Sequence, residues 1–309
     1  MTKRLLALLV MEAVAIAGLL TLALDMRAHN RVERLGGVNI WGYRGPVMRR
    51  KAANEIRIAA AGGDLAFGWG VAPGETLIFN VRQLLALTLD QRGGRLHTFT
   101  AVDVGAIGLT PAEYAGWIQH FAYLQPDVVC LVPDTRHHRA ANVSVQPDRG
   151  SPIFRSFGYA PILPLVVEEK GAVMHSRMVR AAGSIVAQLD RIGAVTADPS
   201  AGGRESGAAY VGVIKQAVQT ALANGSAVVL IGPPVLTVED AVDRGALAEM
   251  VMATFGNEPR VRFVDLGERA DMAEPAMWLG GVALSAAGHA KAASHVVPDV
   301  LQLVQRLVS

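Results

Sequence analysis

One cluster of residues has the types that could bind a metal ion. His137 and His138 follow Asp134, and imidazole and carboxylate groups are common zinc ligands. However, adjacent histidines point in different directions in regular structure, and no third ligand follows at a spacing typical of zinc sites. We therefore expect solvent-facing loop histidines, with no metal and no other cofactor.

Other reactive side chains have simpler structural explanations. Cys130, the single cysteine, lies in the apolar run Val128–Val132, which indicates a buried thiol and excludes an intrachain disulfide. Ser285 precedes an apolar helix that contains His289, and serine at that position caps a helix. The turn at Gly232-Pro233-Pro234 lacks the lysine and the spacing of a phosphate-binding loop.

Four segments resemble, in order, the sequence blocks of SGNH/GDSL hydrolases. Ile58 to Val71, with Gly62-Gly63-Asp64-Leu65 after an apolar run, resembles the first block, in which a strand leads into Gly-Asp-Ser. Val102 to Thr110 resembles the second block, and Pro126 to Val129 stands where the third begins. Gly280 to His289 resembles the last block. Together they cover most of the chain after Ile56, and the resemblance implies the fold of that family.

The side chains that carry the chemistry of that family are replaced. Its mechanism needs a serine nucleophile, a histidine base, an aspartate that orients the base, and glycine and asparagine donors for the oxyanion. By the resemblance, Leu65 stands at the serine position and Ala283 at the histidine position. Gly280 stands at the aspartate position, and Pro133 or a direct neighbour stands at the asparagine position.

Two residues of the family pattern are retained. Gly105 corresponds to the glycine whose N–H donates to the oxyanion, and Asp64 corresponds to an aspartate with a structural role. Leucine has no nucleophilic atom and alanine cannot accept a proton. Because loss of a triad member costs about 10⁴–10⁶ in rate, we expect no hydrolysis by this mechanism. The resemblance therefore implies a degenerate, catalytically inactive member of the family.

Strands and helices that alternate along the chain must position these residues. Apolar runs predict strands at 56–61, 97–102, 128–132, 227–231 and 261–264. Helical spacing predicts helices at 77–89, 111–124, 173–192, 208–223, 238–255 and 285–307. Continuous apolar strands between helices indicate a parallel sheet covered on both faces. We predict a three-layer α/β/α, SGNH/flavodoxin-like fold with a mostly parallel five-stranded sheet, over residues 55–309.

The N-terminal segment is long and apolar enough to cross a membrane. Leu5 to Leu24 is apolar apart from Glu12 and a few small residues, and about 20 residues match a bilayer core of about 30 Å. A cleaved signal peptide has a shorter apolar region, followed by a cleavage site of small residues that this segment lacks. We predict a transmembrane anchor over residues 1–26, followed at 27–54 by a basic, glycine-rich linker that packs on the domain.

The charges beside this segment bear on its orientation. Lys3 and Arg4 favour a cytoplasmic N-terminus, and a long following domain crosses the membrane largely regardless of flanking charge. We expect a single-pass protein of the bacterial inner membrane with a periplasmic domain. A carboxylate at Glu12 is costly in lipid, so it either contacts a partner helix or stays protonated or reaches the interface on a lone helix.

One stretch departs from the alternation of strands and helices. Residues 136–170 form a long excursion in which apolar and aromatic side chains lie among turn formers. Long insertions of this kind are usually functional or disordered, and the aromatic content argues for order. We predict an ordered lid or docking surface, with Phe154, Phe157 and Tyr159 as the candidate interaction residues.

These features favour a structural function over an enzymatic one. The balance of 29 Lys+Arg against 27 Asp+Glu gives no basic excess, so we expect no nucleic acid partner. The first hypothesis is a membrane-anchored structural subunit that contacts other subunits of a complex through the N-terminal helix and the excursion, and lipid through the helix. The alternative is an acyl- or glycan-binding accessory protein of envelope polysaccharide assembly. A residual esterase or acyltransferase is a third reading.

Overall fold

The computed structural model describes residues 3–34, 38–68, 70–90, 98–134, 152–159, 161, 163, 207–232, 234, 238–279 and 283–308. Contacts divide the chain into two compact units. The first unit is Met1–Gly42 with Val143–Gly203, and the second is Tyr43–Asn142 with Arg204–Ser309. The predicted helix at 173–192, most of the excursion, and the residues Gly280, His137 and His138 lie outside the described residues.

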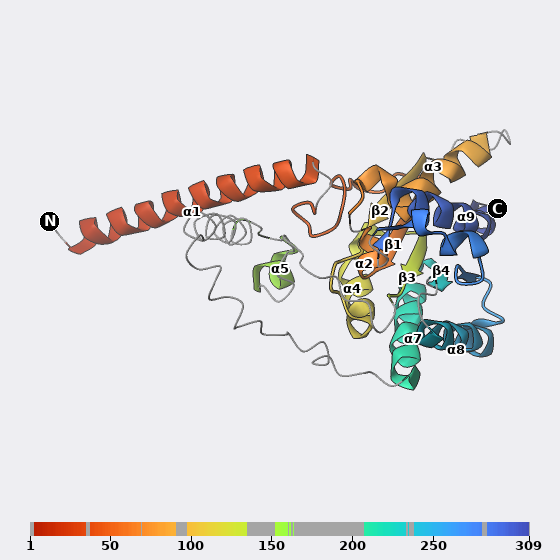
Figure 1. The fold of residues 1–309 in the computed structure, drawn as a ribbon. Helices are drawn as coiled ribbons and strands as arrows, with labels where there is room; N and C mark the ends of the chain where they lie inside the picture. The colour runs from red at the N-terminus through yellow and green to blue at the C-terminus, as the bar shows by residue number, and fades with distance from the viewer. Residues whose placement is uncertain are drawn as a thin grey trace, which may run out of the picture. The chain divides into compact units, whose positions relative to one another are not determined.

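The second unit is built on a parallel sheet of five strands in the order β2-β1-β3-β4-β5 (Figure 1). The strands are β1 (Glu55–Gly62), β2 (Thr98–Asp103), β3 (Val128–Val132), β4 (Ala227–Gly232) and β5 (Val261–Asp265). Every residue of β1, β3 and β4 is buried, which explains why β3 and β4 are continuous apolar runs. β1 begins with a buried ion pair between Glu55 and Arg57 and is apolar from Ile58 on. The predicted sheet and its parallel arrangement are confirmed.

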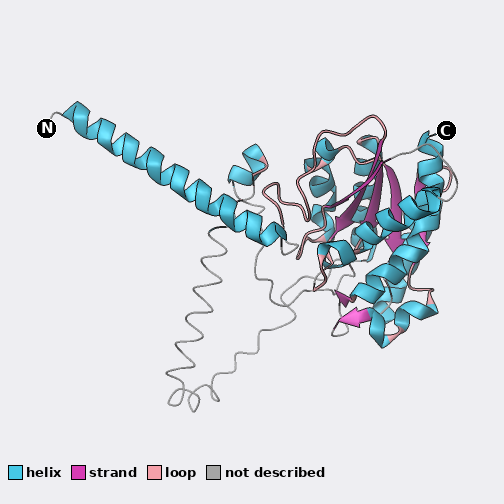
Figure 2. Ribbon diagram, turned by 90° about the horizontal axis from the view of Figure 1, so that it is seen from above, coloured by secondary structure: helices cyan, strands magenta, loops and turns pink. Residues whose placement is uncertain are grey.

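Helices cover both faces of the sheet (Figure 2). On one face lie α3 (Leu77–Asp90) and α9 (Ala286–Val308), which pack against each other. On the other face lie α4 (Tyr114–His120), α7 (Gly207–Ala223) and α8 (Val238–Phe255). The three-layer α/β/α class is therefore confirmed.

The helix predicted at 111–124 is divided into three short elements. These are a 3₁₀ turn η2 (Pro111–Glu113), helix α4, and a second 3₁₀ turn η3 (Ala122–Leu124). Pro111 stands in the first turn, as predicted, and Gln125 ends the run in a left-handed conformation with φ of 51°. The break is physical: residues 117, 118 and 121 are buried, so packing on the sheet sets the path of the chain here.

Small elements gather beyond the carboxyl ends of the strands. They are helix α2 (Asp64–Phe67), the turns η1 (Pro73–Glu75), η6 (Ala270–Ala273) and η7 (Pro275–Met277), and the antiparallel strands β6 (Trp278–Leu279) and β7 (Ala283–Leu284). Parallel α/β sheets bind their ligands at this edge, so these elements frame the candidate site.

The first unit contains helix α1 (Lys3–Arg34) and the short helix α5 (Pro152–Phe157). Residues Arg4–Asn30 of α1 have a mean hydropathy of 2.4 and are long enough to cross a membrane. Side chains from Arg4 to Leu24 are exposed on every side of the helix. The predicted N-terminal apolar helix is therefore present, and by length and composition it could cross a membrane.

Candidate functional site

The turn after β1 has no room for any residue but glycine at two positions. Gly62 has a φ of +144°, and a Cβ there would lie 2.0 Å from the carbonyl oxygen of Val132. A Cβ at Gly63 would lie 1.7 Å from Oδ2 of Asp134. These two glycines let strand β1 turn sharply and begin α2 against the residue that follows β3.

Leu65, which the sequence resemblance aligns with a serine nucleophile, lies in the hydrophobic core. Its side chain is 6% exposed and belongs to the cluster formed by β1, α3 and α9. Ala283, at the position of the base, lies on β7, which contacts α2, and is also buried. The structure therefore brings these two elements together, with an apolar residue at each of the two positions.

The carboxylate of Asp134 occupies the backbone donors at the start of α2. Its Oδ1 accepts a hydrogen bond from the N–H of Leu65 at 3.0 Å, and its Oδ2 accepts one from the N–H of Asp64 at 2.7 Å. The first turn of a helix leaves such N–H groups without intrahelical partners, so a carboxylate is well suited to this place.

Two tyrosines hold the backbone of Asp134 in place. Its N–H donates to the hydroxyl oxygen of Tyr114 at 3.1 Å, and the hydroxyl of Tyr210 donates to its carbonyl oxygen at 3.0 Å. Burial and the neighbouring charge of Asp64 raise the pKa of Asp134 to about 7, although the two N–H donors oppose that shift. Hydrogen bonds at both the N–H and the carbonyl of Asp134 thus fix the backbone that carries this carboxylate.

The N–H of Gly105 is also bonded to a carboxylate of the chain. It donates to Oδ1 of Asp103 at 3.0 Å, in a local turn directly after β2. Asp103 is fully buried, and burial raises its pKa well above the usual range against the opposing charge of Arg44. A Cβ at Gly105 would lie 2.5 Å from the backbone nitrogen of Phe67, so this glycine allows α2 to pack closely.

Arg44 is a buried part of the site that the sequence did not reveal. Its backbone N–H donates to the carbonyl oxygen of Asp103 at 2.8 Å. Its guanidinium donates to the carbonyl of Gly68 at 2.7 Å and also to the carbonyls of Phe67 and Val71, while its Cζ lies 4.7 Å from the centre of the Phe67 ring. Arg44 therefore fixes the carboxyl end of α2, where cations are favoured.

His289 lies on α9 and is buried beside this arginine. Its Nδ1 accepts a hydrogen bond from the N–H of Leu77 at 3.2 Å, which leaves the proton of the neutral ring on Nε2. Burial and then the charge of Arg44 lower the pKa of His289 to about 4. This histidine is a neutral structural acceptor for the start of α3.

The remaining predicted residues have structural places. Asp64 accepts a hydrogen bond from the N–H of Gly108 at 2.8 Å and so holds the loop after β2. Ser285 Oγ accepts one from the N–H of Gly288 at 3.1 Å, which confirms the helix cap. Cys130 is fully buried, as predicted, and burial raises the pKa of its thiol to about 12. Pro133 is buried, but the polar group near Leu65 comes from Asp134.

The interaction candidates lie in the first unit. Glu12 is exposed on α1, and Phe157 is 76% exposed at the end of α5. The hydroxyl of Tyr159 donates a hydrogen bond to Oδ2 of Asp25 on α1. For Phe154 the structure describes only the backbone, within α5. Within the described residues, no group of three His, Cys, Asp or Glu side chains could hold a metal ion.

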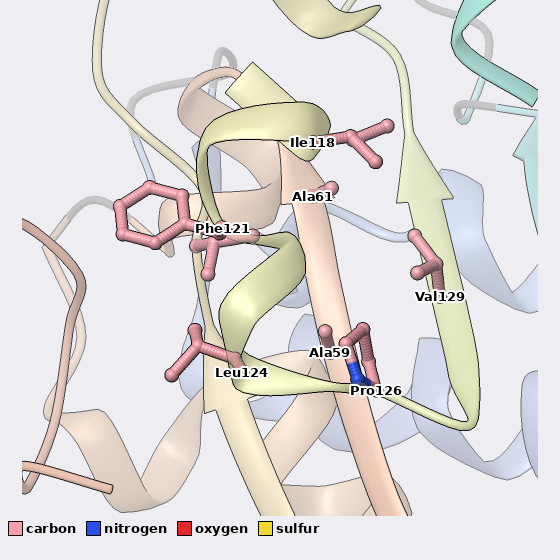
Figure 3. A pocket seen from close by; sticks show the side chains of 8 residues that line it. Ala59, Ala61, Ile118, Phe121, Leu124, Pro126 and Val129 are labelled. Carbon is pink, nitrogen blue, oxygen red and sulfur yellow. The ribbon is translucent and has the colours of Figure 1, made fainter. Parts of the chain in front are cut away.

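A small cavity lies on the other face of the sheet, away from Leu65. It measures about 20 Å³ and lies between strand β1 and the segment of α4 and η3 (Figure 3). All of its lining residues are apolar: Ala59, Ala61, Val104, Ile118, Phe121, Leu124, Pro126 and Val129. A void of this size without polar partners is a packing defect rather than a substrate pocket.

Comparison with known proteins finds similarity in fold only. No family model and no curated protein matches the sequence. Similar solved structures include a lipolytic protein of the G-D-S-L family from Desulfitobacterium hafniense DCB-2, at 11% identity and a TM-score of 0.44 over 78% of this chain and 98% of that chain. A family 3 carbohydrate esterase from Clostridium thermocellum has 13% identity and a TM-score of 0.44 over 82% and 100%. LAE5, an α/β hydrolase enzyme from the metagenome of Lake Arreo, has 14% sequence identity and a TM-score of 0.47, over 80% of this chain and 96% of that chain.

Proposed function

We propose that this chain is a non-catalytic, membrane-anchored subunit that contributes a structural domain to a membrane protein complex. In this proposal α1 spans a bacterial inner membrane once, with the N-terminus in the cytoplasm and the α/β domain in the periplasm. The partners are other membrane subunits, which contact α1 and the segment 136–170.

The proposal rests on the hydrogen bonds of two backbone N–H groups, those of Leu65 and Gly105. Acyl-transfer enzymes stabilise a developing oxyanion with N–H groups that are free to receive it. Here the N–H of Leu65 donates to Asp134 and the N–H of Gly105 donates to Asp103. A substrate oxyanion would have to displace a carboxyl group of the chain from each of these donors. The same site has a buried leucine and a buried alanine at the positions of the nucleophile and the base.

A hydrolysis assay tests the non-catalytic part. We expect the purified chain to hydrolyse p-nitrophenyl acetate no faster than the variant Asp134→Ala, which disturbs the site, or a buffer blank. Turnover by the wild type that Asp134→Ala or Leu65→Ala abolished would overturn the proposal and favour a rebuilt esterase.

Co-purification tests the structural part. A tagged chain is extracted from its native membrane in mild detergent, and we expect defined membrane subunits to co-purify in fixed proportion. Glu12→Leu on the exposed surface of α1 is expected to reduce their recovery, whereas the neighbouring change Met11→Leu is expected to leave it unchanged. Recovery of a glycan or lipid-linked sugar without protein subunits would instead favour the accessory binding function.

A further inference from the structure

The buried residues of α1 begin where its apolar span ends. Side chains up to Leu24 are exposed, whereas Asp25 and His29, one turn apart, are buried within the chain. The exposed part, Leu5 to Leu24, has the length of a bilayer core, about 30 Å. The position of Asp25 therefore marks one membrane boundary if α1 crosses the bilayer, as the proposed function requires.

The segment after α5 supplies the partners of Asp25. Oδ1 of Asp25 accepts a hydrogen bond from the N–H of Leu163 at 2.6 Å, and Oδ2 accepts one from the hydroxyl of Tyr159. Nε2 of His29 lies 3.5 Å from Oδ2, and its ring meets the Tyr159 ring edge-on at 5.9 Å. A carboxylate at the end of a membrane span is thus bonded on both oxygens. Figure 1 and Figure 2 both place α5 beside the C-terminal half of α1.

Helix α5 presents apolar side chains that the protein leaves uncovered. Phe157 is 76% exposed and Ile153 is 49% exposed. They are four positions apart in the sequence, so they lie on one side of the short helix. Phe157 is only two residues from Tyr159, which ties this surface to the level of Asp25. Arg27, exposed on α1 close to the same level, provides a positive charge for lipid phosphates.

We propose that Ile153 and Phe157 form a second membrane contact, which inserts into the lipid headgroup region at the end of the α1 span. The bond between Tyr159 and Asp25 fixes α5 at this depth. Tyrosine is enriched at that level because its apolar ring and polar hydroxyl suit the boundary between hydrocarbon and water, as at Tyr159. Purely apolar side chains such as those of Ile153 and Phe157 form the buried face of helices that lie in this region. This inference rests on the proposed membrane span of α1 and adds to it a lipid-binding surface in the excursion.

Depth-dependent fluorescence quenching tests the contact. The single native cysteine, Cys130, is fully buried, so an introduced cysteine can be labelled selectively. Phe157→Cys, labelled with an environment-sensitive fluorophore, is reconstituted as the full chain in vesicles of phosphatidylcholine and phosphatidylglycerol. We expect blue-shifted emission and strong quenching by lipids that carry a nitroxide near the headgroup. Ser156→Cys is the matched control, because Ser156 is the adjacent exposed residue; its label is expected to stay quenched by aqueous iodide.

Two further variants separate the possible failures. A label at Val14→Cys, in the middle of α1, is expected to be quenched by nitroxides deep in the acyl chains. If the Val14 label is quenched and the Phe157 label is as accessible to iodide as the Ser156 label, the second contact is disproved and the span stands. If the Val14 label is not quenched either, the span itself is wrong. Tyr159→Phe, which removes the hydroxyl donor to Asp25, is expected to reduce lipid quenching of the Phe157 label; unchanged quenching would disprove the fixing role of Tyr159.

Discussion

At the scale of single residues, the site is organised by charges that belong to the chain. Asp134 and Asp103 accept the backbone N–H groups of Leu65 and Gly105, and Arg44 bonds to the carbonyls at the other end of α2. Each of these buried side chains thus pairs with backbone groups that a short helix or a turn leaves without partners.

The acidity of Asp134 makes a testable prediction. Its pKa is about 7 in the folded chain against 3.8 for an ordinary aspartate, so the folded state holds the proton more tightly. The stabilisation is complete below about pH 3.8 and is lost as the pH rises through 7. We expect the free energy of unfolding to lose a contribution on the order of a few kcal/mol over this window, and Asp134→Asn to remove it. Urea titrations at several pH values measure how the free energy of unfolding changes with pH.

His289 acts in the opposite direction over part of the same range. Its pKa is about 4 in the folded chain against 6.5 normally, so its contribution is present above 6.5 and is lost as the pH falls toward 4. The two slopes partly cancel in the wild type. Asp134→Asn should therefore leave a protein whose stability falls on acidification from pH 6.5 to 4. Equal slopes in wild type and variant would contradict the assignment to Asp134.

Because Leu65 is buried in the core, its substitution is expected to lower stability, as core mutations do. We expect Leu65→Ala to lower the free energy of unfolding by about 2–4 kcal/mol, because it removes buried methyl groups and leaves a cavity beside α3 and α9. Leu87→Ala is the matched control: Leu87 is 54% exposed on α3, and its loss should cost less than about 0.5 kcal/mol. Chemical denaturation measures both. A Leu65→Ala protein as stable as the control would mean that Leu65 faces an open cleft.

At the scale of elements, the sequence predicts what depends on local pattern. The strand at 128–132 was predicted with the bounds of β3, and the helix at 238–255 with those of α8, because long apolar runs and helical spacing are local properties. Arg44 and the contacts of Asp134 were not predicted. Arg44 precedes the first strand in a segment that was read as linker, and its partners are 23 to 27 positions away. The donors to Asp134 are 69 and 70 positions away, so only the folded sheet brings them together.

Because α2 lies close to the loop after β2, a methyl group added at Gly105 is expected to destabilise the fold. Gly105→Ala places a Cβ 2.5 Å from the backbone nitrogen of Phe67, where no flexible side chain can move aside. We expect a loss of about 2–3 kcal/mol, because the two elements must separate. Gly116→Ala is the control: nothing lies within 4 Å of its Cβ on helix α4, so it should stabilise the protein by about 0.5–1 kcal/mol. Thermal unfolding followed by circular dichroism compares the two, and equal effects would contradict the close packing.

At the scale of the whole molecule, the chain combines an apolar helix long enough to cross a membrane with a domain whose sheet has helices on both faces. The exposed apolar residues of α1 outnumber those of the second unit, where exposed positions such as Leu87 and Met252 are scattered. Scattered apolar residues are normal on a soluble surface, whereas a continuous apolar helix is not. The continuous apolar surface of α1 is what the proposed membrane span requires, whereas the second unit has only scattered exposed apolar residues.

The side of the membrane on which the domain lies can be read with one cysteine. Met252 is 78% exposed on α8, and the native Cys130 is buried, so Met252→Cys gives a single reactive thiol on the domain. We expect a membrane-impermeant maleimide to label this variant in intact spheroplasts, because the proposed function places the N-terminus, with Lys3 and Arg4, in the cytoplasm and the domain beyond a single span. Met252→Ser, which leaves only Cys130, should stay unlabelled. Labelling only after the membrane is opened would place the domain in the cytoplasm, and the charges Arg27, Arg31 and Arg34 would then determine the orientation.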